Sequence, residues 1–348
     1  MRIVIESYAE ILDGFNTKLR GEDLWVFSIG RVLAEYGHEV TFVGFSEGKP
    51  IVNKQTPRVT WLDKREIHTL KGQEFDCLFI LAGAITYIDN YRDRWNDIVF
   101  KKRLVGCFEN KTHDQLQLLD NEILVTPFSY GDHSNNRKPL PIPFGEFQES
   151  KFDNKTIAWT AKDIIHWCIT DPEWFRSFEY AQYSKSSLPT WLSALQKVAK
   201  NYPINFFSLS KEENDYLQQF ENKYTSMGWF DYQAKLRECS IAIPLHRAGS
   251  LGDVVFNGLV PILPWNWLDA GPPDFNISRI PYLPQYIINE LSHFRRTHEW
   301  SENDIIMEIE WLMNDKTEYN NRLDLLRLGL SSHLDHIVEQ YFSEIMEP

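Results

Sequence analysis

The chain has 348 residues, of which 43% are hydrophobic and 24% are charged. This length and composition are typical of a globular protein with about two domains, each large enough to bury a core. The formal net charge of −13 excludes a basic surface that binds nucleic acid over the whole molecule, although a local basic groove is compatible with it. No apolar run approaches the roughly 20 residues that a membrane-spanning helix needs.

The four cysteines, Cys77, Cys107, Cys168 and Cys239, are scattered and lie in or beside apolar runs. They show neither the spacing of metal ligands nor the pattern of a disulfide framework. Residues 2–5 are followed at once by polar residues, so no secretory signal peptide is predicted. We therefore expect a cytoplasmic protein with reduced cysteines.

The first half of the chain alternates between predicted strands and helices. A buried strand over residues 2–6 precedes a loop over residues 7–21, a helix over residues 22–36 and a strand over residues 39–45. Apolar positions in the helix recur at three and four residues. Strand, helix and strand within about 45 residues predict a βαβ unit. Further strands are predicted at residues 58–62, 75–82, 103–108 and 122–127, with a helix over residues 88–100.

The alternation restarts after residues 131–154, which are rich in Pro, Asn and Gly and mark a domain boundary. Strands are predicted at residues 178–183, 204–209, 241–245 and 260–263. Helices are predicted at residues 189–200, 211–222, 230–238 (with Asp231 as N-cap), 253–257, 285–295, 302–314 and 317–345. The pattern predicts an α/β fold with two Rossmann-like domains, 1–150 and 151–348, facing each other across a cleft, with C-terminal helices closing the structure.

A polar loop between the strand at 241–245 and the helix at 253–257 gives the strongest binding signal. It contains Arg247, Gly249, Ser250 and Gly252 and leads into Asp253. Ligands of open parallel sheets bind outside the carboxyl ends of the strands, and a helix N-terminus there favours phosphate. The loop therefore predicts a phosphate-bearing ligand, with an ordinary strand–loop–helix connection as the alternative. No G-x-G-x-x-G follows the first strand, so a nicotinamide or flavin site has little support.

Two segments carry a resemblance to a known fold family. Residues 21–45 include Tyr-Gly-His-Glu-Val at positions 36–40, and residues 227–245 read MGWFDYQAKLRECSIAIPL. The first resembles the opening helix and second strand of GT-B glycosyltransferases, and the second resembles the short helix and strand before their donor loop. The resemblance implies sugar transfer from a nucleotide sugar, with an N-terminal acceptor domain and a C-terminal donor domain.

Within that fold, the layout is most similar to the DNA glucosyltransferases of T-even-type phages. Residues 75–88 (FDCLFILAGAITYI) and 103–116 (RLVGCFENKTHDQL) carry the resemblance, together with chain length and element order. It implies a 5-hydroxymethylpyrimidine base in phage DNA as the acceptor, and Asp253 as the residue that holds the nucleotide ribose. The chain departs from these enzymes at Lys185, where an arginine-rich diphosphate clamp is expected, and in its acidic charge. Residues 246–253 also lack the Glu-x7-Glu pair that is the signature of a common retaining family.

Catalysis with inversion needs a base for the acceptor hydroxyl. Glu109 and Asp114 follow the predicted strand at 103–108, and Asp13 lies in the first glycine-bearing loop, so these three carboxylates are the candidates. A retaining mechanism needs no such base, and the sequence leaves the stereochemistry open.

The leaving diphosphate needs positive charge or N–H donors. The predicted donor-binding residues either supply positive charge or hydrogen-bond donors to the diphosphate or accept a hydrogen bond from the ribose. They are Lys185, Ser184, Ser186, Arg247, Gly249, Ser250, Gly252 and Asp253. Helix capping is the alternative role for the serines and for Asp253. The nucleotide sugar is the expected co-substrate. No Asp-x-Asp motif is present, so no metal site is predicted, and Mg²⁺ assistance to the diphosphate stays open.

Three short basic clusters are candidates for contact with a DNA acceptor: residues 101–103, 137–138 and 295–296. Scattered solvated charges are the alternative for each cluster. The sequence thus favours a glycosyltransferase of hydroxymethylated DNA. A glycosyltransferase of cell-surface carbohydrate or lipid, a non-catalytic nucleotide-sugar binding protein and a nucleotide-sugar epimerase are the alternatives. The sugar, the nucleotide and the oligomeric state are left open.

Overall fold

The computed structural model describes most of the chain, in two compact units. The described residues are 1–10, 21–45, 58–81, 91–106, 117–127, 137–143, 148, 152–160, 164–176, 179–207, 210–224, 227–244, 250–263, 299–330 and 333–347. The first unit is Met1–Gly145 with Ser332–Pro348, and the second is Glu146–Ser331. The C-terminal segment Ser332–Pro348 thus belongs to the first unit, whereas the sequence prediction placed it in the second domain.

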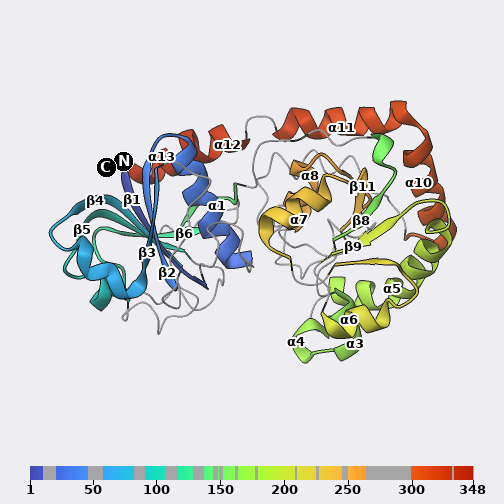
Figure 1. Cartoon of the computed structure of the whole chain (residues 1–348), viewed down its shortest axis with the longest axis horizontal. Coiled ribbons are helices and arrows are strands. Elements are labelled where there is room, and N and C mark those ends of the chain that lie inside the picture. The colour runs from blue at the N-terminus through green and yellow to red at the C-terminus, as the bar shows by residue number, and fades with distance from the viewer. Residues whose placement is uncertain are drawn as a thin grey trace. The chain divides into compact units, whose positions relative to one another are not determined.

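The first unit is built on a parallel sheet of seven strands (Figure 1). Its strands are β1 (Arg2–Glu10), β2 (Glu39–Phe45), β3 (Val59–Asp63), β4 (Glu74–Leu81), β5 (Val99–Gly106), β6 (Glu122–Thr126) and β7 (Arg137–Pro139). Their order is β3-β2-β1-β4-β5-β6-β7. The direction of winding reverses between β1 and β4, which makes this unit an open doubly wound sheet with a switch point there.

Helix α1 (Gly21–Glu35) approaches this sheet closely because Gly30 has no side chain. A Cβ atom at Gly30 would lie 2.3 Å from Cζ of Phe42 and 2.5 Å from Cδ1 of Ile5. The 3₁₀ helix η1 (Lys64–Leu70) begins with a capping box in which Asp63 is the N-cap.

The C-terminal segment adds α12 (His333–Asp335), the π-helical turn η4 (His336–Phe342) and α13 (Ser343–Met346) to the first unit. Nε2 of buried His333 donates to the carbonyl oxygen of Ile142 at 2.9 Å. Nζ of Lys102 donates to the carbonyl oxygens of Ile345, at 2.8 Å, and of Glu347. These contacts join the end of the chain to the core of the first unit.

The second unit contains a parallel sheet of five strands in the order β10-β9-β8-β11-β12. The strands are β8 (Ile157–Trp159), β9 (Ile204–Phe206), β10 (Asn222–Lys223), β11 (Ile241–Ile243) and β12 (Val260–Pro261). Its helices are η2 (Phe152–Asn154), α3 (Ile164–Thr170), α4 (Glu173–Arg176), α5 (Glu179–Val198), α6 (Lys211–Tyr216), α7 (Trp229–Leu236), α8 (Ser250–Phe256), α10 (Glu302–Asn314) and α11 (Lys316–Leu330). Here the winding reverses between β8 and β11.

Several predicted elements of the second unit are wrong. Residues 179–183, predicted as a strand, form the start of α5, which continues through Pro189 to Val198. Buried residues at helical spacing, including Leu188, Trp191 and Leu195, face the interior, and α5 packs against α10. The first strand of this unit is instead β8, which was not predicted because it has only three residues.

Two helix boundaries also need correction. The N-cap of α7 is Gly228 rather than Asp231. The helix predicted over residues 88–100 does not continue to its end, because β5 begins at Val99. The helix predicted over residues 285–295 lies outside the described residues.

Candidate functional site

The candidate site is the switch point of the second unit, at the carboxyl ends of β8 and β11. These strands pair in parallel, with Trp159 opposite Ile243 as the last pair. The backbone N–H of Thr160, the residue after β8, donates to the carbonyl oxygen of Ile243 at 3.4 Å. In open α/β sheets, ligands bind in the crevice outside the strand ends at such a switch point.

Two polar side chains that follow β8 in the chain have buried atoms without a hydrogen-bond partner among the described residues. Thr160 is 2% exposed, and its Oγ1 atom has no partner in the part of the chain that the structure describes. Nδ1 of His166, in the first turn of α3, is also buried and has no hydrogen-bond partner among these residues. More than nine-tenths of buried polar groups in proteins are hydrogen-bonded, so the Thr160 hydroxyl directly after β8 indicates a place prepared for a polar ligand. Elsewhere in the described part of this unit, Trp159, Asp171, Ser187 and Trp191 each have one such buried atom.

Neither Thr160 nor His166 was among the predicted site residues. The prediction placed the first strand of this domain at residues 178–183 and therefore looked for donor ligands after residue 183. The available signal was the apolar triplet before Thr160, which is β8 in the structure.

Asp253 lies in α8, next to the switch point in the chain, and is 4% exposed. Its Oδ1 atom accepts a hydrogen bond of 2.7 Å from Nε2 of Gln233 in α7. Burial raises the pKa of Asp253 to about 7, and the hydrogen bond from Gln233 opposes this rise. Because α8 begins at Ser250, Asp253 is inside the helix, which excludes the alternative role of N-cap. Gly252 is buried in the same turn.

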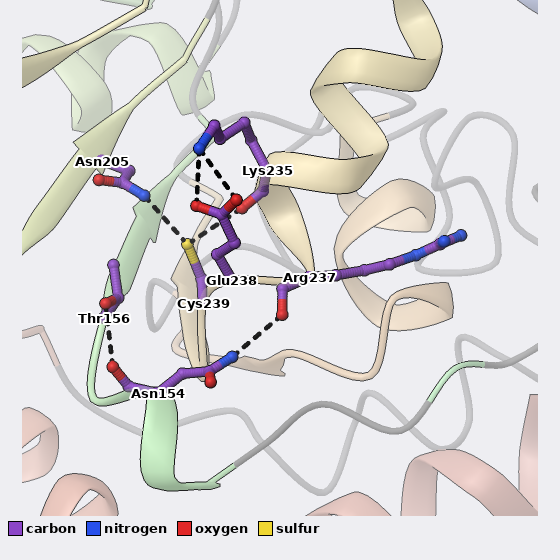
Figure 2. Close-up of polar contacts among 7 residues, drawn as sticks. All are labelled: Asn154, Thr156, Asn205, Lys235, Arg237, Glu238 and Cys239. Carbon is purple, nitrogen blue, oxygen red and sulfur yellow. Dashed lines mark hydrogen bonds and ion pairs between the residues drawn. The ribbon is translucent and has the colours of Figure 1, made fainter.

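Aromatic packing surrounds this part of α7. Burial, and then the nearby Asp253 carboxylate, raise the pKa of Tyr232 well above its usual value. The Tyr232 ring meets Phe207, the residue after β9, edge to face with ring centres 5.5 Å apart. Figure 2 shows the C-terminal end of α7, where Sγ of Cys239 lies 3.5 Å from Nδ2 of Asn205 and Lys235 is paired with Glu238. The Cys239 thiol is therefore part of the core, as the sequence predicted for the cysteines.

Lys185 is not in a loop at a strand end but within α5, so the predicted loop position of residues 184–187 is wrong. Its Nζ atom lies 2.6 Å from Oδ2 of Asp171, and Nε of Arg176 lies 3.1 Å from the same oxygen. The hydrogen bond from Lys185 lowers the pKa of Asp171. Two half-exposed cations thus share one carboxylate, and Arg176 is a neighbour that the sequence did not indicate. Ser184 and Ser186 belong to the same helix.

The remaining predicted site residues have little or no structural description. Glu109, Asp114, Asp13, Arg247 and Gly249 lie outside the described residues. Ser250 is the first residue of α8.

The best described basic cluster is engaged within the first unit. Nζ of Lys101 lies 2.6 Å from Oδ1 of Asp76, and Lys102 binds the C-terminal carbonyl oxygens. Arg103 is 8% exposed, and its Nη2 atom donates to the carbonyl oxygen of Trp95 at 3.4 Å. This cluster therefore does not form the predicted track of free cations, and Arg295 and Arg296 of another cluster lie outside the described residues.

The described part of the chain offers no candidate metal site and no candidate membrane span. Among those residues, no group of three or more His, Cys, Asp or Glu side chains is arranged to hold a metal ion. None of the helices found there is long and apolar enough to cross a bilayer.

No protein-family model matches the sequence, and no curated protein matches it either. Solved structures, in contrast, match over the whole chain. An α-glucosyltransferase in complex with UDP-glucose and DNA containing an abasic site superposes with a TM-score of 0.54 at 12% identity, covering 100% of this chain and 99% of that one. A T4 phage BGT mutant in complex with UDP-glucose gives a TM-score of 0.57 at 11% identity, with 100% of both chains covered.

The DNA-modifying enzyme β-glucosyltransferase gives a TM-score of 0.53 at 14% identity, again over 100% of both chains. At these identities the likeness concerns the fold. It agrees with two parallel sheets flanked by helices, each wound in both directions from a switch point. The resemblance predicted from the sequence is thereby confirmed: this chain has the α/β GT-B fold, and its structure resembles those of the phage DNA glucosyltransferases.

Proposed function

We propose that this protein is a glycosyltransferase that moves a sugar from a nucleotide-sugar donor to an acceptor hydroxyl. Two observations carry the proposal. One is the whole-length likeness to glucosyltransferases solved with UDP-glucose, and the other is the buried Thr160 hydroxyl at the switch point of the second unit, which has no partner among the described residues. A fold alone does not define an activity, and this hydroxyl supplies the local argument for a ligand.

The donor binds outside the carboxyl ends of β8 and β11. Thr160 and His166 supply polar contacts to it, and Asp253 accepts from a ribose hydroxyl. Gln233 occupies Oδ1 of Asp253, and no described residue bonds the other carboxylate oxygen. The predicted donor ligands of the following loop and of α5 complete the site; they are Arg247, Gly249, Ser250, Gly252, Lys185, Ser184 and Ser186.

In an inverting transfer, one of Glu109, Asp114 and Asp13 takes the proton of the acceptor hydroxyl. The acceptor oxygen then forms a bond to the anomeric carbon while the bond from that carbon to the diphosphate oxygen breaks. Cationic side chains and loop N–H groups stabilise the charge on the departing diphosphate. No metal ion is required in this scheme, and Mg²⁺ would act only by neutralising the diphosphate.

The preferred acceptor is a 5-hydroxymethylpyrimidine base in DNA. The support is the whole-length match to an α-glucosyltransferase solved with DNA. The net charge of −13 and the engaged cations of the first unit favour the rival acceptors, which are a cell-surface carbohydrate or a lipid.

The first test is a thermal-shift screen of the full chain against nucleotide sugars and free nucleotides, with and without Mg²⁺. A ligand that binds only the folded state raises the melting temperature when it is present well above its dissociation constant. The donor found in this way is then supplied, with its sugar labelled, to a DNA duplex that contains 5-hydroxymethylcytosine. The matched control is the same duplex with 5-methylcytosine, which lacks the acceptor hydroxyl.

Label in the hydroxymethylated duplex alone is the expected result. Transfer of label to a carbohydrate or lipid extract instead would support the proposed glycosyl transfer but show that DNA is not the acceptor. Conversion of the donor without an acceptor would identify an epimerase, and tight binding without turnover would identify a non-catalytic binding protein. Binding of no nucleotide would refute the proposed function. Asp253→Ala is expected to weaken donor binding by about 1–3 kcal/mol, the scale of a lost hydrogen bond to a charged group.

A further inference from the structure

Four polar side chains form a continuous hydrogen-bonded row between α7 and α8. Nε of Arg237 donates to Oδ1 of Asn257 at 2.9 Å. Nδ2 of Asn257 donates to Oε1 of Gln233, and Nε2 of Gln233 donates to Oδ1 of Asp253 at 2.7 Å. Gln233 and Arg237 are four residues apart, as are Asp253 and Asn257, so each pair lies on one side of its helical segment.

The row is buried at every position except its cationic end. Gln233 is 5% exposed, Asp253 4% and Asn257 3%. Arg237 is exposed, and in Figure 2 its side chain extends away from the cluster around Cys239, while its carbonyl oxygen accepts from Nδ2 of Asn154. Arg237 therefore connects solvent to a buried carboxylate through two amides.

All hydrogen bonds along this row run in the same direction, from Arg237 towards Asp253. An arginine side chain can only donate, so Asn257 must present its oxygen to Arg237 and its NH₂ group to Gln233. Gln233 in turn must present its oxygen to Asn257 and its NH₂ group to Asp253. The row is therefore satisfied only by an acceptor at the position of Oδ1 of Asp253, which fixes the orientation of that carboxylate.

We propose that Gln233 is a positioning residue of the donor site: it occupies Oδ1 of Asp253 and leaves Oδ2 directed to a ribose hydroxyl of the nucleotide sugar. This inference rests on the proposed function, because it assigns a role to Gln233 through the donor contact of Asp253. Arg237 and Asn257 act one step further away, by fixing the amide of Gln233.

The arrangement links donor affinity to pH. Among the described residues, Tyr232 of α7 lies beside Asp253, and Arg237, the residue that follows α7, stands at the far end of the row. Burial favours the neutral form of Asp253, whereas the N–H of Gln233 favours the carboxylate. Since the ribose hydroxyl needs an acceptor, donor affinity should fall as the pH drops through the pKa of Asp253. Loss of the hydrogen bond from Gln233 should raise the pKa of Asp253, and should therefore raise the pH at which the affinity for the nucleotide sugar begins to fall.

The test is calorimetric titration of the full chain with UDP-glucose and with UDP from pH 5.5 to pH 9. Gln233→Leu should shift the affinity midpoint upward by about one pH unit and weaken binding about 5- to 10-fold at pH 7. The matched control is Gln196→Leu, the same change at an exposed position of α5, which should reproduce the wild-type curve. Melting temperatures measured at each pH confirm that each protein is folded during titration.

Gln233→Glu keeps the size of the side chain and supplies the second, decisive variant. In this variant the carboxyl groups at positions 233 and 253 are in contact and share one proton over a broad pH range. A protonated Glu can therefore donate the hydrogen bond to Asp253 that Gln donates in the wild type. The affinity of this variant for the nucleotide sugar should approach that of the wild type at acid pH and should fall as the pH rises. This trend is opposite to that of the wild type.

These trends distinguish positioning from a purely structural role. A uniform loss of affinity at all pH values, or wild-type profiles in both variants, would overturn the role of Gln233. A wild-type affinity that does not vary with pH would do the same. If the wild type binds neither UDP-glucose nor UDP, the proposed donor itself is wrong, and the inference falls with it.

Discussion

Asp253 is expected to make the stability of the second unit fall as the pH rises. Its carboxyl is 4% exposed, and burial raises its pKa to about 7 from 3.8. In the unfolded chain this group loses its proton near pH 3.8, whereas in the folded protein it keeps the proton until about pH 7. Between these values the folded state binds more protons, so each rise in pH favours unfolding.

The substitution Asp253→Asn removes this titration and retains an oxygen that can accept from Gln233. Each pH unit within the window corresponds to 1.36 kcal/mol, so the two units between pH 5 and about pH 7 amount to about 3 kcal/mol. Relative to the variant, the wild type should therefore lose about 3 kcal/mol of stability between pH 5 and pH 8. For a unit of this size the change corresponds to about 6–12 °C in melting temperature.

The assay is differential scanning calorimetry of both proteins at pH 5 and pH 8 in the absence of nucleotide. All other titrating groups are shared, so the difference between the two proteins isolates Asp253. The variant should be the more stable protein at pH 8, at the expense of donor binding, which is the usual relation between stability and a buried functional charge. An equal difference in melting temperature at both pH values would refute the reasoning.

Three further predictions concern single positions. Thr160→Val should leave the melting temperature unchanged or raise it, because the lost hydroxyl has no partner among the described residues. The same variant should bind the nucleotide sugar about 3- to 10-fold more weakly by calorimetry, and weakened stability with intact binding would contradict the ligand role. Gly30→Ala should destabilise the protein by about 1–3 kcal/mol in urea unfolding, although alanine favours helices, because the new Cβ would overlap Phe42 and Ile5; a stabilised variant would show that α1 shifts freely. Burial lowers the pKa of His333 to about 4 from 6.5, so the stability of the first unit should fall as the pH drops through this range, by about 3 kcal/mol. His333→Gln should flatten that dependence in urea titrations at pH 4.5 and pH 7, and an unchanged slope would exclude His333 as its source.

Strong local signals determined which elements could be predicted. The strand over residues 39–45 and the helix over residues 302–314 have the predicted bounds. The strand combines an uninterrupted β-prone run with a preceding glycine turn. The helix begins with a capping box between Ser301 and Asp304, which marks its start in the sequence itself.

Short or conflicting signals explain the errors. The aromatic run before residue 184 favours a strand, and Pro189 favours a break, yet packing of α5 against α10 keeps one helix through both. Proline is favoured in the first turn of a helix, which fits the predicted start at residue 189, but α5 begins at Glu179. Strand β8 is held by its two neighbours in the sheet rather than by its own sequence, which three residues cannot specify.

The candidate site was predictable only where it depends on chain order. The position of Asp253 after a buried strand indicated its place near a sheet edge, and the structure puts it in α8. The unpaired state of Thr160 and the contact of Gln233 with Asp253 depend on which helices meet in space. No spacing rule relates residues 160, 233 and 253, so their association needed the three-dimensional structure.

The return of the last helices to the first unit has a consequence for the order of folding during synthesis. Every strand of the first sheet leaves the ribosome before residue 145, but Lys102 can meet the carbonyl oxygens of Ile345 and Glu347 only after the entire second unit has been made. Domains generally fold as they emerge, so the second unit has all its residues available first. Until residues 333–346 have been synthesised, the Lys102 side chain and the surface beneath α12 and α13 stay exposed in the nascent first unit. In a chain that ends shortly before residue 333, this surface would stay exposed permanently.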